Sequence, residues 1–164
     1  GMPGVGKSTA GVILAKRLGM NFIDTDIHIQ QQTGHTLHNL ITDQGLKAFC
    51  RLEAELVSKL DLQNHIIATG GSVVYGDLAM QNLKQNGLVL WLDLPFVKLA
   101  RRLGDLDARG VVMEPGQTLE QLYAFRQPFY QKYADVKINT DNLNIDTTVT
   151  QITDYLSRRE LFST

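Results

Sequence analysis

The first residues of the chain have the spacing of a phosphate-binding loop. Residues 1–8 read GMPGVGKS, which fits G-x-x-x-x-G-K-[ST], and a helical pattern follows directly. In such a loop the glycines let backbone N–H groups turn toward a phosphate, the lysine reaches the β- and γ-phosphates, and the following hydroxyl can ligate Mg²⁺. We therefore predict a site for ATP and Mg²⁺ formed by Gly1, Gly4, Val5, Gly6, Lys7, Ser8 and Thr9.

Two carboxylates follow at the end of the next predicted strand, in the sequence Asp24-Thr25-Asp26. Open α/β sheets place their sites at the carboxyl ends of the strands. One carboxylate there can hold a hydrated metal ion, while the other accepts the proton of an attacking hydroxyl. Acidic residues also cap helices, so Asp26 as the N-cap of the following helix is the alternative explanation.

Composition excludes several other classes of protein. The 164 residues carry 16 Lys and Arg against 17 Asp and Glu, so the net charge of −1 lacks the basic excess of proteins that bind nucleic acid or anionic membranes. No apolar run is long enough to span a bilayer, and no secretion signal is visible, so we expect a cytoplasmic protein. Cys50 is the only cysteine, which excludes an internal disulfide and a cysteine-based zinc site. The four histidines lack metal-ligand spacing, and we interpret them as structural or exposed.

Short apolar runs alternate with stretches of helical period, which predicts a single α/β domain over residues 1–164 with a parallel sheet between helices. In the first helix we expect Val12, Leu14, Ala15 and Leu18 to face inward. Residues 104–116 hold three glycines and a proline, and we predict a mobile loop there. We expect strands at 21–24, 66–69, 88–93 and 136–139, and helices at 7–18, 26–32, 37–60 with a break near Gly45, 77–85, 95–103, 119–134 and 147–159.

One element is missing from this pattern. A phosphate-binding loop normally follows a buried strand, but the motif here starts at Gly1. Five buried apolar residues would contribute about 10 kcal/mol, which is comparable to the stability of a whole domain. We therefore expect that the chain is shortened at its N-terminus; otherwise its sheet lacks a central strand or takes one from a neighbour.

Five segments together resemble the shikimate kinase family in order and approximate spacing: GMPGVGKST, FIDTDIHIQQQTG, FCRLEAE, ATGGSVV and FRQPFY. The resemblance runs from Gly1 to about Thr140. It implies a P-loop NTPase fold of three α/β/α layers, similar to nucleoside monophosphate kinases, with a five-stranded parallel sheet and a closing lid. It also implies transfer of the γ-phosphate of ATP to a hydroxyl of a small cyclic polyol carboxylate.

The resemblance assigns roles to individual residues. Asp24 and Ser8 correspond to the metal ligands, and Asp26 to the acceptor-binding base. Gly70 and Gly71 correspond to glycines that line the acceptor pocket, within an acceptor-binding segment that includes residues 26–60. The remaining matches are three arginines: Arg126 for the substrate carboxylate, Arg109 for the lid over the transferring phosphate, and Arg102, a weaker match, near the nucleotide base.

The chain departs from the family pattern at the acceptor. The family's F-R-x-x-E is Phe49-Cys50-Arg51-Leu52-Glu53 here, so Cys50 replaces a carboxylate-binding arginine, and Arg51 lies about 100° round the helix. The family's third glycine is Ser72, and the lid carries Asp105 and Asp107. We expect Cys50, Ser72 and Arg126 to face the acceptor.

These departures leave alternatives to a shikimate kinase. One alternative is a kinase that phosphorylates another small hydroxylated molecule, such as a sugar acid or polyol. A nucleotide-binding module without catalysis is the other, although the retained Lys7, Asp26 and Arg109 argue against it. In every case we expect a small-molecule partner, neither nucleic acid nor membrane, and a monomer, with a dimer as the alternative.

Overall fold

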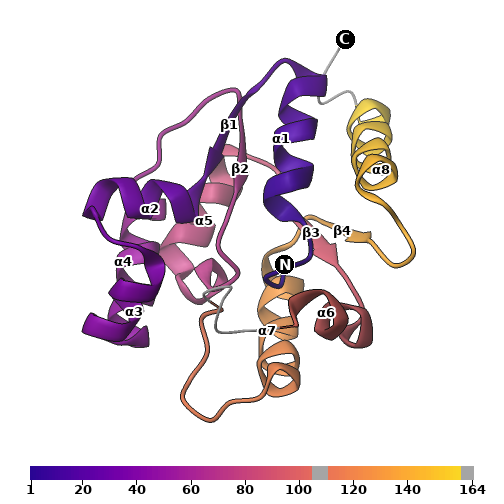
Figure 1. Ribbon diagram of the computed structural model, residues 1–164. Helices are drawn as coiled ribbons and strands as arrows, with labels where there is room; N and C mark the ends of the chain where they lie inside the picture. The colour runs from indigo at the N-terminus through magenta and orange to yellow at the C-terminus, as the bar shows by residue number, and fades with distance from the viewer. Residues whose placement is uncertain (105–110, 160–164) are drawn as a thin grey trace.

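The computed structural model describes residues 1–104 and 111–159 (Figure 1). Helices and strands alternate through them, as the sequence predicts, and most boundaries agree within one or two residues. In chain order the elements are α1 (Lys7–Leu18), β1 (Asn21–Asp24), α2 (Thr25–Thr33), α3 (Leu37–Gln44), α4 (Leu46–Ser58), β2 (His65–Ala68), the 3₁₀ turn η1 (Val73–Tyr75), α5 (Asp77–Asn86), β3 (Leu90–Asp93), α6 (Phe96–Leu103), α7 (Leu119–Tyr133), β4 (Val136–Asn139) and α8 (Ile145–Arg158).

The strands form two parallel pairs. β1 pairs with β2, with Asn21 opposite His65, and β3 pairs with β4, with Leu90 opposite Val136. Within the described ranges, β2 and β3 are not hydrogen-bonded to each other, so the implied five-stranded sheet appears as two separate two-stranded sheets. Because both pairs are parallel, each brings the carboxyl ends of its strands, and the loops that follow, to one edge.

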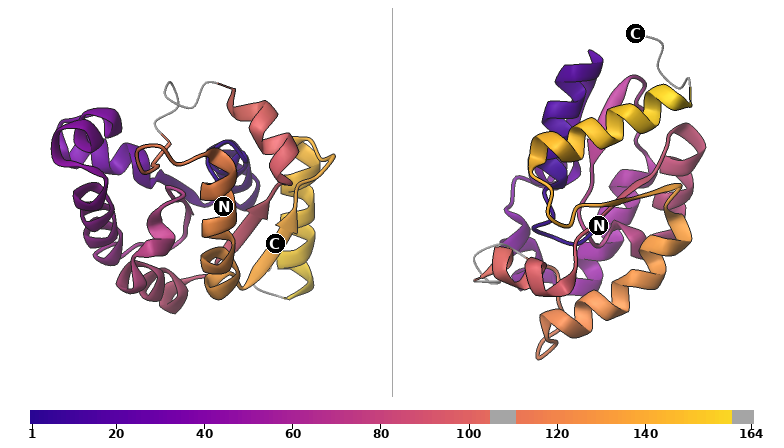
Figure 2. Two further views of the ribbon diagram at one scale, coloured as in Figure 1. Left: turned by 90° about the horizontal axis from the view of Figure 1, so that it is seen from below. Right: turned by 90° about the vertical axis from the view of Figure 1, so that its right-hand side faces the viewer.

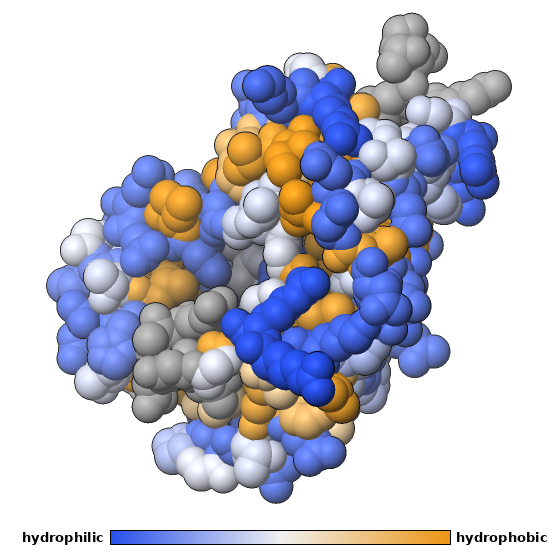
Figure 3. All heavy atoms as spheres, turned by 45° about the vertical axis from the view of Figure 1, so that its right-hand side comes forward, coloured by the Kyte–Doolittle hydropathy of each residue, from blue (hydrophilic) through white to orange (hydrophobic). Residues whose placement is uncertain are grey.

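Helices cover the strands. α1 contacts β1, β2 and α8, whereas α4 packs on α5. Figure 2 shows β3 and β4 running between α7 and α8. None of the helices within residues 1–104 and 111–159 is long and apolar enough to cross a membrane. On the face drawn in Figure 3, hydrophobic residues form separate groups among hydrophilic ones.

The inward face of α1 differs in one residue from the prediction. Leu14 and Ala15 are buried and Leu18 is half-buried, but Val12 is 50% exposed. Its place is taken by Gly11, where an added Cβ would lie 2.8 Å from the Phe22 ring. The helix therefore approaches β1 over a glycine, and its inward stripe runs through positions 11, 14, 15 and 18 at helical spacing.

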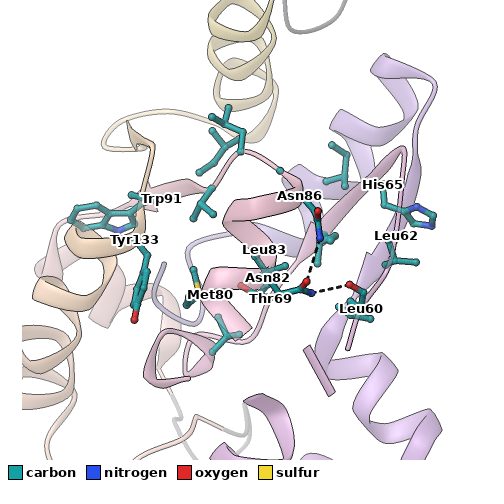
Figure 4. Close-up of a pocket in the computed structure, with 18 of the residues that line it drawn as sticks. Leu60, Leu62, His65, Thr69, Met80, Asn82, Leu83, Asn86, Trp91 and Tyr133 are labelled. Atoms are coloured by element: carbon teal, nitrogen blue, oxygen red, sulfur yellow. Dashed lines mark hydrogen bonds between the residues drawn. The ribbon is translucent and has the colours of Figure 1, made fainter. Parts of the chain in front are cut away.

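A groove of about 690 Å³ lies between the two strand pairs. Figure 4 shows Trp91 of β3 and Tyr133 of α7 on one side of it, with Met80 and Leu83 of α5 near its middle. Gly1 also lines this groove. Among the described residues, this groove separates β2 from β3.

A second, smaller apolar cluster holds the helices of the segment 26–60. Its buried members are Ile29 of α2, Leu40 of α3, Phe49 of α4 and Val112. Val112 comes from the end of the predicted loop at 104–116, of which only residue 104 and residues 111–116 are described. The cluster thus fastens this part of the loop onto α2, α3 and α4.

Candidate active site

The loop before α1 has the backbone conformation that phosphate binding requires. Gly4 and Gly6 have φ values of 77° and 101°, in the left-handed region that favours glycine. A Cβ at Gly4 would also lie 2.8 Å from a side-chain carbon of Leu103. α1 starts at Lys7 immediately after this turn, so the unpaired N–H groups of its first turn face the loop.

Lys7 lies inside the curve of this loop. Its Nζ donates hydrogen bonds of 2.9 Å to the carbonyl oxygens of Gly1 and Met2. Burial lowers the pKa of Lys7 to about 8, and the nearby carboxylate of Asp26 opposes that shift. The ammonium group therefore remains largely charged at neutral pH, which suits a group that neutralises phosphate oxygens.

Ser8 and Asp24 bring two hard oxygen donors together at the start of α1 and the end of β1. Ser8 Oγ donates a hydrogen bond of 2.5 Å to Asp24 Oδ2. Asp24 Oδ1 accepts from the backbone N–H of Asp26 at 2.9 Å, so Asp24 caps α2. A hydroxyl and a carboxylate at this spacing fit the oxygen preference of Mg²⁺.

Asp26 is therefore not the N-cap, and the alternative explanation for it is wrong. It lies in the first turn of α2, and its side chain is half-buried. Burial raises its pKa, the neighbouring Asp24 raises it further, and Lys7 opposes both. A carboxylate with a raised pKa is a better proton acceptor than a solvent-exposed one.

The glycines after β2 bring the backbone against the charged groups of the site. A Cβ at Gly70 would lie 2.3 Å from Glu53 Oε1 and 2.7 Å from Asp26 Oδ1. A Cβ at Gly71 would lie 2.9 Å from Arg126 Nη1. A side chain at either position would therefore have to displace a charged group of the site.

Arg126 is the largest fully buried side chain of the described residues. Its Nε donates to the Tyr75 hydroxyl at 2.7 Å, and Nη2 donates to the Val112 carbonyl at 2.9 Å. Nη1 is buried and has no hydrogen-bond partner in residues 1–104 and 111–159. Two nitrogens of the guanidinium, Nε and Nη2, are thus held by hydrogen bonds, and Nη1 is left to pair with a ligand.

Most of these groups line one cavity of about 490 Å³, although Gly1, Val5 and Asp24 are not among its lining residues. The loop, Lys7, Ser8 and Thr9 form one part of its wall, and Asp26, Gly70, Gly71, Ser72 and Arg126 form another. The volume falls within the range of small-molecule pockets. Segments far apart in the sequence, from α1, α2, α7 and the loop after β2, therefore place a phosphate-binding loop beside a carboxylate base and a buried arginine.

Comparison with known proteins agrees with this geometry. The sequence model of the family described as shikimate kinase matches residues 3–157. Shikimate kinase from Clostridium botulinum (strain Eklund 17B) is 39% identical over 153 residues, which cover 93% of this chain and 91% of that protein. The chain belongs to the shikimate kinase family.

Other shikimate kinases are similar over nearly the whole chain. That of Symbiobacterium thermophilum is 35% identical and covers 97% of this chain and 94% of its own length. The structure of shikimate kinase from Acinetobacter baumannii in complex with shikimate superposes with a TM-score of 0.89 at 28% identity, covering 98% of this chain and 92% of that one. The enzyme from Aquifex aeolicus gives a TM-score of 0.80 at 27% identity, covering 98% and 95%.

The expected shikimate kinase residues are not all brought to the cavity. Cys50 is half-buried and packs against the apolar cluster of Ile29, Leu40, Phe49 and Val112, and it is not among the residues that line the cavity. Arg102 is exposed on the last turn of α6 and does not line the cavity either. Arg109 lies outside the described residues. The roles of Arg102 and Arg109 stay predictions.

Glu53 does not line the cavity but contacts its wall through Ser72, and no role was predicted for it from the sequence. It is fully buried on α4, and its Oε2 accepts a 2.5 Å hydrogen bond from Ser72 Oγ. Burial raises its pKa to about 7. The signal was present in the FCRLE segment, where a charged residue falls on the same helix face as Phe49 and Val57, both of which are buried.

Proposed function

We propose that this chain is an ATP-dependent kinase that phosphorylates a hydroxyl of shikimate, giving shikimate 3-phosphate. The observation that carries the proposal is the shared cavity, in which the phosphate-binding loop, Asp26 and Nη1 of Arg126 meet. Family membership supports the same activity, and the Acinetobacter baumannii relative was solved with shikimate bound.

In this mechanism an acceptor hydroxyl attacks the γ-phosphorus of ATP. Asp26 accepts the hydroxyl proton, the bond from the γ-phosphorus to the β–γ bridging oxygen breaks, and ADP leaves. Lys7 and the N–H groups at the start of α1 hold phosphate oxygens, while Arg126 pairs with the acceptor's carboxylate. Ser8 and Asp24 would hold Mg²⁺, which when bound neutralises charge on the phosphates. Arg109 is proposed to close over the transferring phosphate.

A direct test is to identify the phosphorylated product. The protein is incubated with Mg·ATP and, separately, with shikimate, sugar acids and uncharged polyols, and the products are examined by mass spectrometry. Phosphorylated shikimate formed at the highest rate supports the proposal. Faster phosphorylation of another acceptor would instead support a different substrate, and no product from any acceptor would support a non-catalytic module.

A different hydroxylated acceptor is the second candidate, and the position of Cys50 favours it. The family's carboxylate-binding arginine is replaced by a thiol that does not line the cavity. The variant Cys50→Arg separates the candidates. If shikimate is the substrate, the added cation should lower the KM for shikimate several-fold; if another acceptor is native, its turnover should not improve. Steady-state kinetics with each acceptor measure the difference.

A further inference from the structure

Ser72, which lines the active-site cavity, forms a buried hydrogen-bonded pair with Glu53, which lies behind it. Ser72 follows Gly70 and Gly71 at the end of β2, and Glu53 lies on α4. Both side chains are buried, with exposed fractions of 2% and 0%. The 2.5 Å hydrogen bond from Ser72 Oγ to Glu53 Oε2 therefore forms without competition from solvent.

The second oxygen of the same carboxylate is left without a partner. Glu53 Oε1 is buried and accepts no hydrogen bond from any described residue, and the same holds for Arg126 Nη1 as a donor. Oε1 lies close to Gly70, which lines the cavity: a Cβ added to this glycine would lie 2.3 Å from Oε1. Buried polar atoms without partners cost free energy unless a ligand pairs with them.

The helix that carries Glu53 supplies no cation to hold it. Cys50 lies one turn earlier on α4, and burial raises the pKa of its thiol to about 11, so it is neutral at physiological pH. Arg51, the next residue, is exposed. In this chain the side-chain hydrogen bond that fixes the Glu53 carboxylate therefore comes from Ser72, at a position where the family pattern has glycine.

We propose that Ser72 is a positioning residue for the acceptor. Its hydroxyl anchors Oε2 of Glu53 and thereby leaves Oε1 against Gly70 at the cavity wall. From there Oε1 accepts a hydrogen bond from an acceptor hydroxyl. This inference rests on the proposed function, because it assigns the pair to the acceptor side of the same site.

The pair also affects proton binding at Glu53. Burial raises the pKa of Glu53 to about 7 and Asp26 on α2 raises it, whereas the Ser72 hydrogen bond, Arg126 on α7 and Lys7 on α1 lower it. A hydroxyl that donates to a carboxylate favours the ionised form. Loss of the Ser72 hydroxyl should therefore move the acid limb of kcat/KM for shikimate to higher pH.

The test compares Ser72→Ala with Ser157→Ala, which removes an exposed hydroxyl from α8. For Ser72→Ala we expect the KM for shikimate to rise about tenfold, the loss expected for one hydrogen bond to a charged group. The KM for ATP should stay within about twofold. The acid limb should move to higher pH. Ser157→Ala should match the wild type in all three.

Glu53→Gln completes the cycle. If Ser72 acts through Glu53, adding Ser72→Ala to Glu53→Gln should change the KM far less than it does in the wild type. The proposal would be overturned if the rise in KM in the double variant equalled the product of the rises in the two single variants. An unchanged KM and pH profile in Ser72→Ala would also overturn it. Ser72→Gly, with the residue of the family pattern, serves if the alanine variant fails to fold. An unmodified protein without shikimate-dependent ADP release would instead defeat the proposed function.

Discussion

Two cavities formed by the described residues meet at Thr69 and Gly70, yet they are lined by opposite kinds of residue. The cavity of about 490 Å³ gathers Lys7, Asp26 and Arg126, whereas the groove of about 690 Å³ is lined mainly by apolar side chains and strand edges. The smaller cavity is therefore suited to a small charged ligand, whereas the side chains of the larger groove contribute mainly to apolar packing. The difference shows that size alone does not identify an active site.

We therefore expect substitutions in the polar cavity to change reaction rates and those in the groove to change stability.

The largest effect is expected for Asp26→Asn, which removes the proton acceptor but keeps the shape of the side chain. Turnover should fall by about 10²- to 10⁴-fold, the usual contribution of a general base. Affinity for ATP should stay nearly unchanged. Steady-state kinetics and calorimetric ATP binding measure the two; unchanged turnover would discard the assignment of Asp26 as base.

The next effect concerns acceptor binding. Arg126→Lys keeps the positive charge but loses the planar fork that is fixed by Tyr75 and Val112. We expect the KM for shikimate to rise about 10- to 100-fold. The control is Arg158→Lys, at an exposed position on α8, which should behave as wild type. A similar KM for both variants would exclude Arg126 as the carboxylate partner.

A third prediction concerns pH and stability. The pKa of Glu53 is about 7 in the folded protein and near 4.5 in the unfolded chain. Between these values the folded state binds more protons, so the free energy of unfolding falls as pH rises from about 4.5 to about 7, by at most about 3 kcal/mol. Glu53→Gln should lack this decline. Thermal melting at pH 5 and pH 8 tests it, and parallel changes in both proteins would contradict it.

The smallest effect is expected in the groove. Trp91 lines it, stacks 5.8 Å from the Tyr130 ring and is 6% exposed. Trp91→Phe should lower the free energy of unfolding by about 1–2 kcal/mol, because the smaller ring leaves part of this contact unfilled. It should leave kcat within about twofold. Denaturant unfolding and steady-state kinetics test both. A large loss of kcat with an unchanged free energy of unfolding would contradict the assignment of the groove to stability rather than catalysis.

The sequence predicted the fold and the phosphate side of the site better than the acceptor side. α1, β1 and β4 were predicted to the residue, and Gly6 and Gly19 mark the two ends of α1. The P-loop is a continuous motif, so its geometry follows from local spacing.

Tertiary contacts decided what the sequence left open. Whether Asp24 or Asp26 caps α2 depends on side-chain orientation, and the structure selects Asp24. The role of Glu53 depends on Ser72, which lies 19 residues away and reaches it only in the fold. The exposure of Val12 depends on the close approach of Gly11 to Phe22, which helical spacing alone does not determine.

The central claim is that the polar cavity transfers phosphate from ATP to shikimate. The most direct measurement is the rate of ADP release from Mg·ATP with and without shikimate, in the unmodified protein and in Asp26→Asn. We predict a large shikimate-dependent rate that the substitution abolishes. Binding of ATP with no stimulation by shikimate would contradict it, and would mean that the altered acceptor pocket serves another molecule or none.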